Sequence, residues 1–273
     1  MKKIIKILVI ILFCSPYTIS VFAQNIDSLA FKAKSIRSAG IGFPALNYDL
    51  LSPLNHSGYS LGFTSSRFTE KKEHLNLFET YFRLGLLHNY ANDSYITLLG
   101  YSASWTLFRY TTDPKKRLQI WLGASAEADI NVYMKDDNTN NPVAYFFNIS
   151  VTPALLIQYR FNIGSSKFEF RQNIGVPLFS LVSTSDFASS MPYGFAEEDA
   201  SFFDTMHFAS LGSLVKCVAI TKLDINTAFQ QRKNMPTFRI SYRFTGLNYQ
   251  HNDISIKSVD NMVVFGALFY LFR

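Results

Sequence analysis

The segment from 117 to 133 alternates between apolar and polar side chains without a break. Its apolar positions are Leu118, Ile120, Leu122, Ala124, Ala126, Ala128, Ile130 and Val132. The positions between them are mostly polar or amphipathic. Successive side chains of a β-strand point to opposite faces, so this pattern predicts a strand with one apolar face and one polar face. Such a strand must place its apolar face against something apolar over its whole length.

The same alternation recurs along most of the chain. Residues 143–161 carry apolar or aromatic side chains at every odd position except Pro153. In 167–178 the even positions are apolar or aromatic, with Gln172 as the one exception. Less regular versions cover 57–69, 73–90, 94–111, 218–230, 236–247 and 254–273. Several exceed the roughly five or six residues typical of soluble strands and reach the roughly nine to eleven of a tilted membrane strand. After the N-terminal region, no uninterrupted apolar run is long enough for a helical span.

Lipid is the environment that accepts an apolar face on strand after strand. Hydrocarbon offers the backbone no hydrogen-bond partner, so strands can span it only as a closed sheet. We therefore expect an all-β fold, an antiparallel transmembrane β-barrel of a Gram-negative outer membrane, over residues 39–273. Tyrosines near the predicted strand ends would form aromatic girdles at the two membrane interfaces. They are Tyr90, Tyr95, Tyr110, Tyr133, Tyr145 and Tyr159.

Parity limits the number of strands. With both termini in the periplasm the number must be even, and the longest connection, 185–206, should face outside. This placement requires an odd number of strands before the connection, which counts 39–46 as the first of seven. If 207–230 is one long, bent strand, the total is ten. Twelve strands are the alternative.

Residues 1–23 have the features of a secretory signal peptide. Lysines precede an apolar run from Ile7 to Phe13, and small or turn-forming residues lead to Ala23. We expect cleavage after Ala23, which leaves 24–38 as a periplasmic segment before the barrel. The apolar run is too short for a membrane anchor. Phe13 is bulky for the position before a lipidated cysteine, which disfavours lipidation of Cys14.

The charge balance points to no nucleic-acid partner. Part of the net positive charge comes from the lysines of the predicted signal peptide, and no basic run is interleaved with aromatic residues. After cleavage Cys217 would be the one remaining cysteine, so an intrachain disulfide is excluded.

Three motifs carry a resemblance to a known family. They are an SPL sequence followed by a Tyr/Gly strand (50–63), an NNP loop (136–156), and a long YG…SFF segment (176–206). In this order they resemble an uncharacterised family of Bacteroidetes outer-membrane proteins, a domain of unknown function. The resemblance covers most of the chain after residue 23 and implies location and fold, without catalytic residues. The C-terminal FGALFYLFR also resembles the aromatic-terminated last strand that the barrel assembly machinery recognises, with Phe272, Tyr270, Leu268 and Val264 in one phase.

Strand phase also predicts which charged side chains face the lumen. The expected set is Glu79, Arg83, Glu127, Asp129, Arg160, Lys167, Glu169, Arg171, Lys222, Asp224, Arg239 and Arg243. Side chains largely fill the interior of barrels of about eight to ten strands, and a buried charge needs a partner. We expect these acids and bases to pair into a plug. The alternative is a narrow pore that the excess of bases makes selective for anions.

The connection 185–206 combines acidic and aromatic side chains and has no Lys or Arg. The possible ligand-binding residues are Tyr193, Phe195, Glu197, Glu198, Asp199, Phe202 and Phe203. Loops longer than about 12 to 15 residues are usually functional or disordered, and disordered segments contain few aromatic residues. We expect either a lid over the barrel mouth or a surface that binds a small solute, an extracellular ligand or a protein.

Catalytic and metal-binding interpretations have little support. His56 with Ser57 and His207 with Ser210 are the close His/Ser pairs, but strand positions one or three apart face opposite ways. The Asp and Asn run at 136–141 lacks the Gly and the downstream Glu of a calcium loop. We expect no enzymatic activity, including lipid modification, and no metal or cofactor. The expected partners are outer-membrane lipid and, during biogenesis, the barrel assembly machinery.

Overall fold

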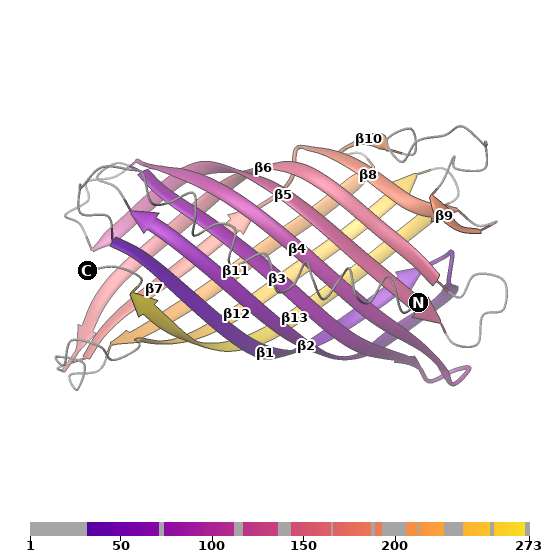
Figure 1. Cartoon of the computed structure of the whole chain (residues 1–273), viewed down its shortest axis with the longest axis horizontal. Coiled ribbons are helices and arrows are strands. Elements are labelled where there is room, and N and C mark those ends of the chain that lie inside the picture. The colour runs from indigo at the N-terminus through magenta and orange to yellow at the C-terminus, as the bar shows by residue number, and fades with distance from the viewer. Residues whose placement is uncertain are drawn as a thin grey trace. The chain divides into compact units, whose positions relative to one another are not determined.

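The computed structural model describes residues 32–70, 74–111, 117–135, 143–164, 166–186, 189–192, 206–211, 213–226, 237–251 and 254–270. The regular elements in these ranges are all β-strands (Figure 1). They are β1 (Lys32–Tyr48), β2 (Ser52–Glu70), β3 (His74–Asn89), β4 (Ser94–Tyr110), β5 (Leu118–Lys135), β6 (Val143–Ile163), β7 (Ser166–Gly175), β8 (Phe179–Asp186), β9 (Ser189–Pro192), β10 (His207–Ser210), β11 (Leu214–Asn226), β12 (Thr237–His251) and β13 (Ile254–Tyr270). The same ranges contain no helix of the length and apolarity that a membrane span requires. The predicted signal peptide, including Cys14 and Ala23, lies outside the described residues.

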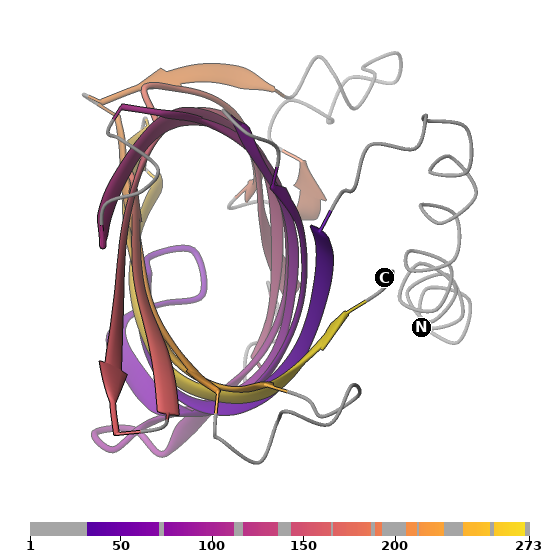
Figure 2. The same ribbon diagram turned by 90° about the vertical axis from the view of Figure 1, so that its left-hand side faces the viewer.

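Ten of these strands close into an antiparallel barrel. β1 to β6 pair in sequence order, β6 pairs with β7, and β7 pairs with β11. β11, β12 and β13 continue the ring, and β13 returns to β1 along the whole strand. Figure 2 shows this closure, where the indigo first strand meets the yellow last strand. The prediction of a closed, ten-stranded all-β barrel is confirmed.

The seventh and eighth predicted strands are each divided in two. The seventh consists of β7 and β8, which are separated at 176–178. The eighth consists of β10 and β11, and between them Ser213 N donates to the Ser210 carbonyl oxygen. The later part of β6, 154–163, pairs with β7, and the earlier part, 146–151, pairs with β8. Pro153 of β6 and Pro177 both lie at this level. Proline has no N–H for the ladder, which accounts for the interruption. β9 pairs only with β8 among the described strands.

The wall begins earlier than the sequence predicts. β1 starts at Lys32, so 32–38, expected as part of a periplasmic segment, lie in the first strand. Ile36 is buried and the neighbouring Arg37 is exposed, which continues the alternation of the strand toward the N-terminus. We call the end where β1 begins and β13 ends the terminal end. The opposite end, which contains the turns at 49–51 and 90–93, is the loop end.

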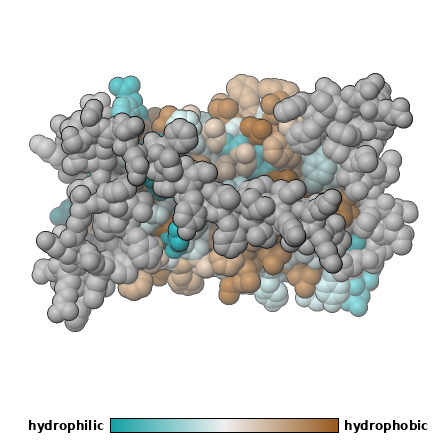
Figure 3. All heavy atoms as spheres, in the orientation of Figure 1, coloured by the Kyte–Doolittle hydropathy of each residue, from teal (hydrophilic) through white to brown (hydrophobic). Residues whose placement is uncertain are grey.

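The outer face of the wall is apolar, as the alternation predicts. In β5, Leu122 is 55% exposed, whereas the adjacent Trp121 is 0% exposed and faces the lumen. Other large apolar side chains exposed on the wall are Ile41, Phe43, Leu61, Phe63, Leu84, Leu86, Leu107, Ile130, Ile149, Val151, Ile240, Val263 and Phe265. Brown, hydrophobic atoms predominate along the middle of the wall that is visible in Figure 3.

The tyrosines predicted to form girdles do not share one environment. Tyr90, Tyr95 and Tyr159 are exposed, and Tyr145 is half-buried. The assignment of Tyr133 is wrong, because its side chain is 1% exposed and packs inside the barrel. Tyr133 belongs to the polar set of alternating positions in β5, and this set faces inward. The prediction relied on its position near the strand end and did not apply this phase. The side chain of Tyr110 lies outside the described part of the chain.

Two apolar clusters occupy the two ends of the lumen. The loop-end cluster contains Leu46, Tyr48, Leu50, Leu51, Leu87, Ile96, Leu98, Tyr133, Ala144, Phe146, Val182, Ala209, Leu214, Leu247, Tyr249, Ile254 and Ile256. The terminal-end cluster contains Ile36, Phe68, Leu75, Leu77, Phe108, Trp121, Ala154 and Leu156. Charged and hydroxyl-bearing side chains occupy the lumen between them, together with a small apolar cluster of Tyr81, Met262 and Val264. Burial of apolar surface therefore holds the ends of the lumen, and polar interactions predominate in its middle.

Candidate functional site

The structure places the charges predicted to face the lumen on the inner side of the wall. They come from β3 (Glu79, Arg83), β5 (Glu127, Asp129), β6 (Arg160), β7 (Glu169, Arg171), β11 (Lys222, Asp224) and β12 (Arg239, Arg243). The side chain of Lys167 lies outside the described part of the chain. Sequence reasoning missed two further members of this group, Lys216 of β11 and Asp260 of β13. We call the whole set the charged lumen.

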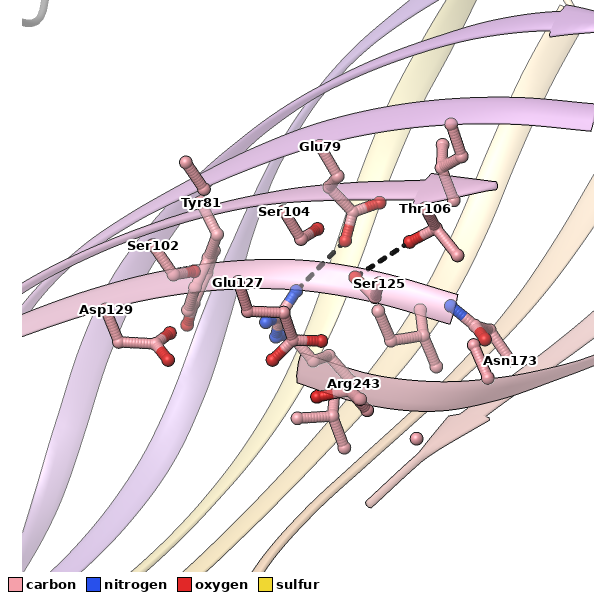
Figure 4. A pocket seen from close by; sticks show the side chains of 17 residues that line it. Glu79, Tyr81, Ser102, Ser104, Thr106, Ser125, Glu127, Asp129, Asn173 and Arg243 are labelled. Carbon is pink, nitrogen blue, oxygen red and sulfur yellow. Dashed lines mark hydrogen bonds and ion pairs between the residues drawn. The ribbon is translucent and has the colours of Figure 1, made fainter. Parts of the chain in front are cut away.

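Glu79 connects opposite sides of the barrel. Its Oε2 accepts hydrogen bonds from Lys222 Nζ (2.7 Å) and Ser66 Oγ (2.9 Å), and its Oε1 accepts one from Arg243 Nη1 (3.0 Å). β3 and β11 lie five positions apart in either direction around the ring, so the Glu79–Lys222 salt bridge crosses the full lumen. Figure 4 shows Glu79 and Arg243 reaching toward each other from their strands. The Arg243 guanidinium also lies 4.4 Å from the centre of the Tyr81 ring.

A second group joins β3, β5 and β13. Arg83 Nη1 donates to Asp260 Oδ2 (2.8 Å), and Arg83 Nη2 donates to Asn131 Oδ1 (2.9 Å). The Tyr81 hydroxyl lies 3.2 Å from the same Asp260 oxygen. Gly100 faces these groups, and a Cβ atom there would come within 2.7 Å of both Arg83 Nε and Asn131 Oδ1. Glycine at this position therefore makes room for the arginine to cross from one strand to another.

A third group is centred on Lys216. Its Nζ donates to Asp129 Oδ2 (2.6 Å) and Glu127 Oε2 (3.0 Å), and so connects β11 with β5. Asn148 of β6 donates from Nδ2 to the same Asp129 oxygen (3.2 Å). One buried ammonium group thus neutralises two carboxylates, which would repel each other without it.

The fourth group lies toward the terminal end. Arg239 forms a two-pronged salt bridge with Asp224, with both hydrogen bonds at 2.5 Å. Glu169 binds Arg171 and also Arg160 (3.1 Å). The guanidinium groups of Arg171 and Arg239 lie 4.9 and 5.3 Å from the centre of the Phe68 ring. This group therefore packs against the terminal-end apolar cluster, to which Phe68 belongs.

Each cation described in these four groups contacts at least one carboxylate. Unpaired charge in a low-dielectric interior is costly, so the pairing has a physical reason. A selective pore would instead present its bases to passing ions. The described arrangement has the geometry of a cross-braced plug.

Three small cavities lie among these side chains, and all three border Arg243. Their volumes are about 30, 40 and 20 Å³, so they hold about one to four water molecules each. Hydroxyl groups from β4 and β5 line the first, and Thr106 donates to Ser125 Oγ (3.0 Å) on its wall (Figure 4). These cavities have room for water and are too small for an organic solute.

The loop-end cluster forms a second barrier. The turn at 49–51 directs Leu50 and Leu51 into the lumen, where both are buried. Aromatic contacts reinforce this layer, with ring centres 5.5 Å apart for Tyr48–Tyr133 and for Phe146–Tyr249. A path along the barrel axis thus meets an apolar layer as well as the charged lumen.

The His56–Ser57 pair does not form, because the two side chains point to opposite faces. His56 instead approaches Ser94 on β4, with 2.9 Å between Nε2 and Oγ, and its Nδ1 lies 3.0 Å from the Leu54 carbonyl oxygen. This contact resembles a nucleophile and its base, but both residues are buried and neither lines a described cavity. Ser94 also donates to Asn92 Oδ1 (2.7 Å). The partner comes from another strand, so spacing in the sequence could not reveal it.

His207 and Ser210 do not bind each other in the described structure. His207 lies 2.5 Å from the Tyr249 hydroxyl and stacks on His251, with 4.0 Å between ring centres. Among the described residues, no three His, Cys, Asp or Glu side chains gather as a metal site. The Asp and Asn run at 136–141 lies outside those residues.

The predicted ligand-binding residues of the long connection also lie outside the described part of the chain. They are Tyr193, Phe195, Glu197, Glu198, Asp199, Phe202 and Phe203. Of this connection, the structure gives the backbone of β9 and the residues that flank it from β8 and β10.

Comparison with known proteins identifies the family of this chain. The sequence matches "Protein of unknown function (DUF3316)" over residues 5–273, so the chain belongs to that family. A search of curated proteins gave no match. Among solved structures, the chain is similar to the translocator domain of the autotransporter NalP from Neisseria meningitidis, with a TM-score of 0.45, 6% identity and 92% of each chain covered.

Two Escherichia coli structures are similar to a comparable degree. The outer membrane protease OmpT has a TM-score of 0.47 and 4% identity, with 89% of this chain and 99% of that chain covered. The transport unit of the autotransporter AIDA-I has a TM-score of 0.43 and 10% identity, with 95% and 97% covered. At these identities the likeness carries no inference about activity.

Proposed function

We propose that this DUF3316 protein is a non-conducting outer-membrane barrel of a Gram-negative bacterium that acts through the surface at its loop end. The observation that carries the proposal is the contrast between the two faces of one wall. The outer face exposes a belt of large apolar side chains, and the inner face is filled by paired charges between two apolar clusters. An apolar exterior around a closed ring of strands suits hydrocarbon.

The filled lumen favours a structural scaffold over a pore. The Glu79–Lys222 and Lys216–Asp129 salt bridges connect distant strands across the space through which a solute would have to move. Opening a path would separate buried charges, which costs several kcal/mol for each broken pair. The scaffold carries the acidic and aromatic connection 185–206. We assign the function to this connection, which binds an extracellular ligand or partner.

We propose no enzymatic role for the barrel. The buried His56–Ser94 contact supports this view, because a hydrolase requires a nucleophile that its substrate can reach. We further propose export through a signal peptide cleaved after Ala23, assembly by the barrel assembly machinery and an origin in Bacteroidetes, on the sequence features described above. The mass of the purified protein tests the cleavage site.

Insertion of a short epitope at two positions tests the location and orientation. The first lies in the turn 90–93 at the loop end, and the matched control lies between β4 and β5 at the terminal end. We expect antibody to label intact cells only for the first variant, and to label the second after the outer membrane is permeabilised. Labelling in the reverse order, or recovery of the protein in the soluble periplasmic fraction, would overturn the proposal.

A further inference from the structure

The cations on the outer face of the wall are not evenly distributed. Arg37, Arg67 and Arg109 point outward from β1, β2 and β4 near the terminal end, whereas Lys257 of β13 points outward near the loop end. On β1 to β4, the outward positions that the structure describes carry no Asp or Glu. The three arginines therefore form a positive surface beside the apolar belt, which we call the arginine patch.

The strand registers bring this patch together. Arg37 pairs with Ser65, so it lies diagonally across the β1–β2 ladder from Arg67, at a Cα separation of about 7 to 8 Å. Arg67 pairs with Phe78, and Phe78 pairs with Trp105. Arg109 lies four residues beyond Trp105 on the same strand and face. The arginines thus lie on the same stretch of wall as one exposed tryptophan, with Arg67 two strands away and Arg109 on the same strand.

Trp105 marks the level of the membrane interface. Its ring is 50% exposed, and its Nε1 donates to Asn76 Oδ1 (2.6 Å), so the side chain has an apolar body and a polar tip. Tryptophan with this character is enriched where hydrocarbon meets headgroups. Arg67 lies two strands across from Trp105 along one pairing row, and Arg109 lies four residues beyond Trp105 toward the terminal end. Long arginine side chains beside an interfacial tryptophan place their charged heads in the headgroup region.

We propose that the arginine patch binds the phosphate-bearing headgroups of anionic phospholipids in the leaflet that surrounds the terminal end. Arginine donates paired, fork-shaped hydrogen bonds that match phosphate oxygens, and attraction to anionic lipid adds to this binding. The inference rests on the membrane location in the proposed function. It adds a lipid class and the three side chains that select it.

The two tryptophans of the chain allow a direct measurement. Trp121 is buried in the lumen and lipid cannot reach it. A Trp121→Phe variant therefore reports from Trp105 alone. The purified full-length protein is reconstituted in phosphatidylcholine vesicles that contain equal fractions of either brominated phosphatidylcholine or brominated phosphatidylglycerol. Bromine quenches tryptophan fluorescence on contact, so the ratio of the two quenching curves gives the lipid preference.

We expect phosphatidylglycerol to be preferred about fivefold for each arginine that reaches a headgroup at low salt, and less at high salt. The triple variant Arg37→Gln/Arg67→Gln/Arg109→Gln should lose the preference and retain quenching by brominated phosphatidylcholine, which shows that it is folded and inserted. The matched control Lys257→Gln should keep the full preference. Equal quenching by the two lipids in the parent protein would overturn the lipid assignment. Absence of quenching by both would overturn the membrane location itself.

Discussion

The charged lumen and the loop-end cluster are both buried inside one barrel, yet different physics holds each of them. In the charged lumen the stability of a side chain depends on a particular partner, as for Glu79 with Lys222 on the opposite strand. In the loop-end cluster a residue such as Leu87 depends on the volume it fills among many apolar neighbours. The charged region should therefore respond sharply to the loss of one group, and the apolar region should respond in proportion to the atoms removed.

The largest effect is expected for Glu79→Ala. This change leaves Lys222 and Arg243 without the carboxylate they share, and removal of one partner from a buried ion pair costs about 3 to 5 kcal/mol. Urea unfolding of the reconstituted protein measures the loss. The triple variant Glu79→Leu/Lys222→Met/Arg243→Met should lose less than the single variant, because it leaves no unpaired charge. If Glu79→Ala is as stable as the parent, the charged lumen does not depend on individual partners and does not differ in this way from the loop-end cluster.

Leu87→Ala should have the next largest effect. The side chain is fully buried in the loop-end cluster, so its truncation leaves a cavity and costs about 2 to 4 kcal/mol of unfolding free energy. The neighbouring Leu86→Ala is the matched control, because Leu86 points outward from the same strand. The control should lose clearly less in the same urea titration. Equal losses at both positions would mean that the loop-end cluster is not packed as described.

Tyr249→Phe should have a smaller effect. It keeps the aromatic contact with Phe146 and removes the hydrogen bond with His207, which is worth about 1 kcal/mol. Thermal unfolding compares this variant with Tyr242→Phe, whose hydroxyl binds Asn261 on the exposed face. A loss in Tyr249→Phe of the size expected for Leu87→Ala would show that polar pairing also holds the loop-end cluster.

The smallest effect is expected at the exposed pair His88–Asp93 in the turn at the loop end. Asp93 is 84% exposed, and an exposed ion pair contributes only about 0 to 1 kcal/mol. Asp93→Asn should therefore unfold like the parent at any salt concentration. A large, salt-sensitive loss would show that charge pairs outside the lumen also hold the barrel.

Strand phase in the sequence was enough to predict the ring. Leu122 and Trp121 face opposite ways as the alternation requires. The total of ten follows from an even number of strands with the long connection 185–206 at the end opposite the termini. The phase was least reliable in β13. Val264 shares the phase of the aromatic C-terminus and is buried in the lumen, and Asp260 shares that inward phase with apolar Ile256 and Met262. An inward face that is itself partly apolar gives no contrast, so Asp260 could not be recognised.

The partners inside the charged lumen could not be predicted from the sequence. Which base meets Glu79 depends on the stagger of the strands around the ring and on the reach of each side chain across it. Lys222 and Arg243 are 143 and 164 residues away from Glu79 in the chain. Lys216 was missed for another reason, because it lies near the start of β11, before the segment 218–230 in which the sequence shows the alternation. The local alternation of a strand determines which side chains face the lumen. The closure of the barrel determines which of them meet.

The central claim is that paired charges and two apolar clusters close the lumen, and single-channel recording in a planar lipid bilayer tests it most directly. We predict that the purified, folded protein gives no reproducible conductance steps in a salt gradient. Reproducible small steps with a reversal potential that shows anion selectivity would contradict the account. They would mean that Arg171 and Arg243 face a continuous water path instead of their carboxylate partners.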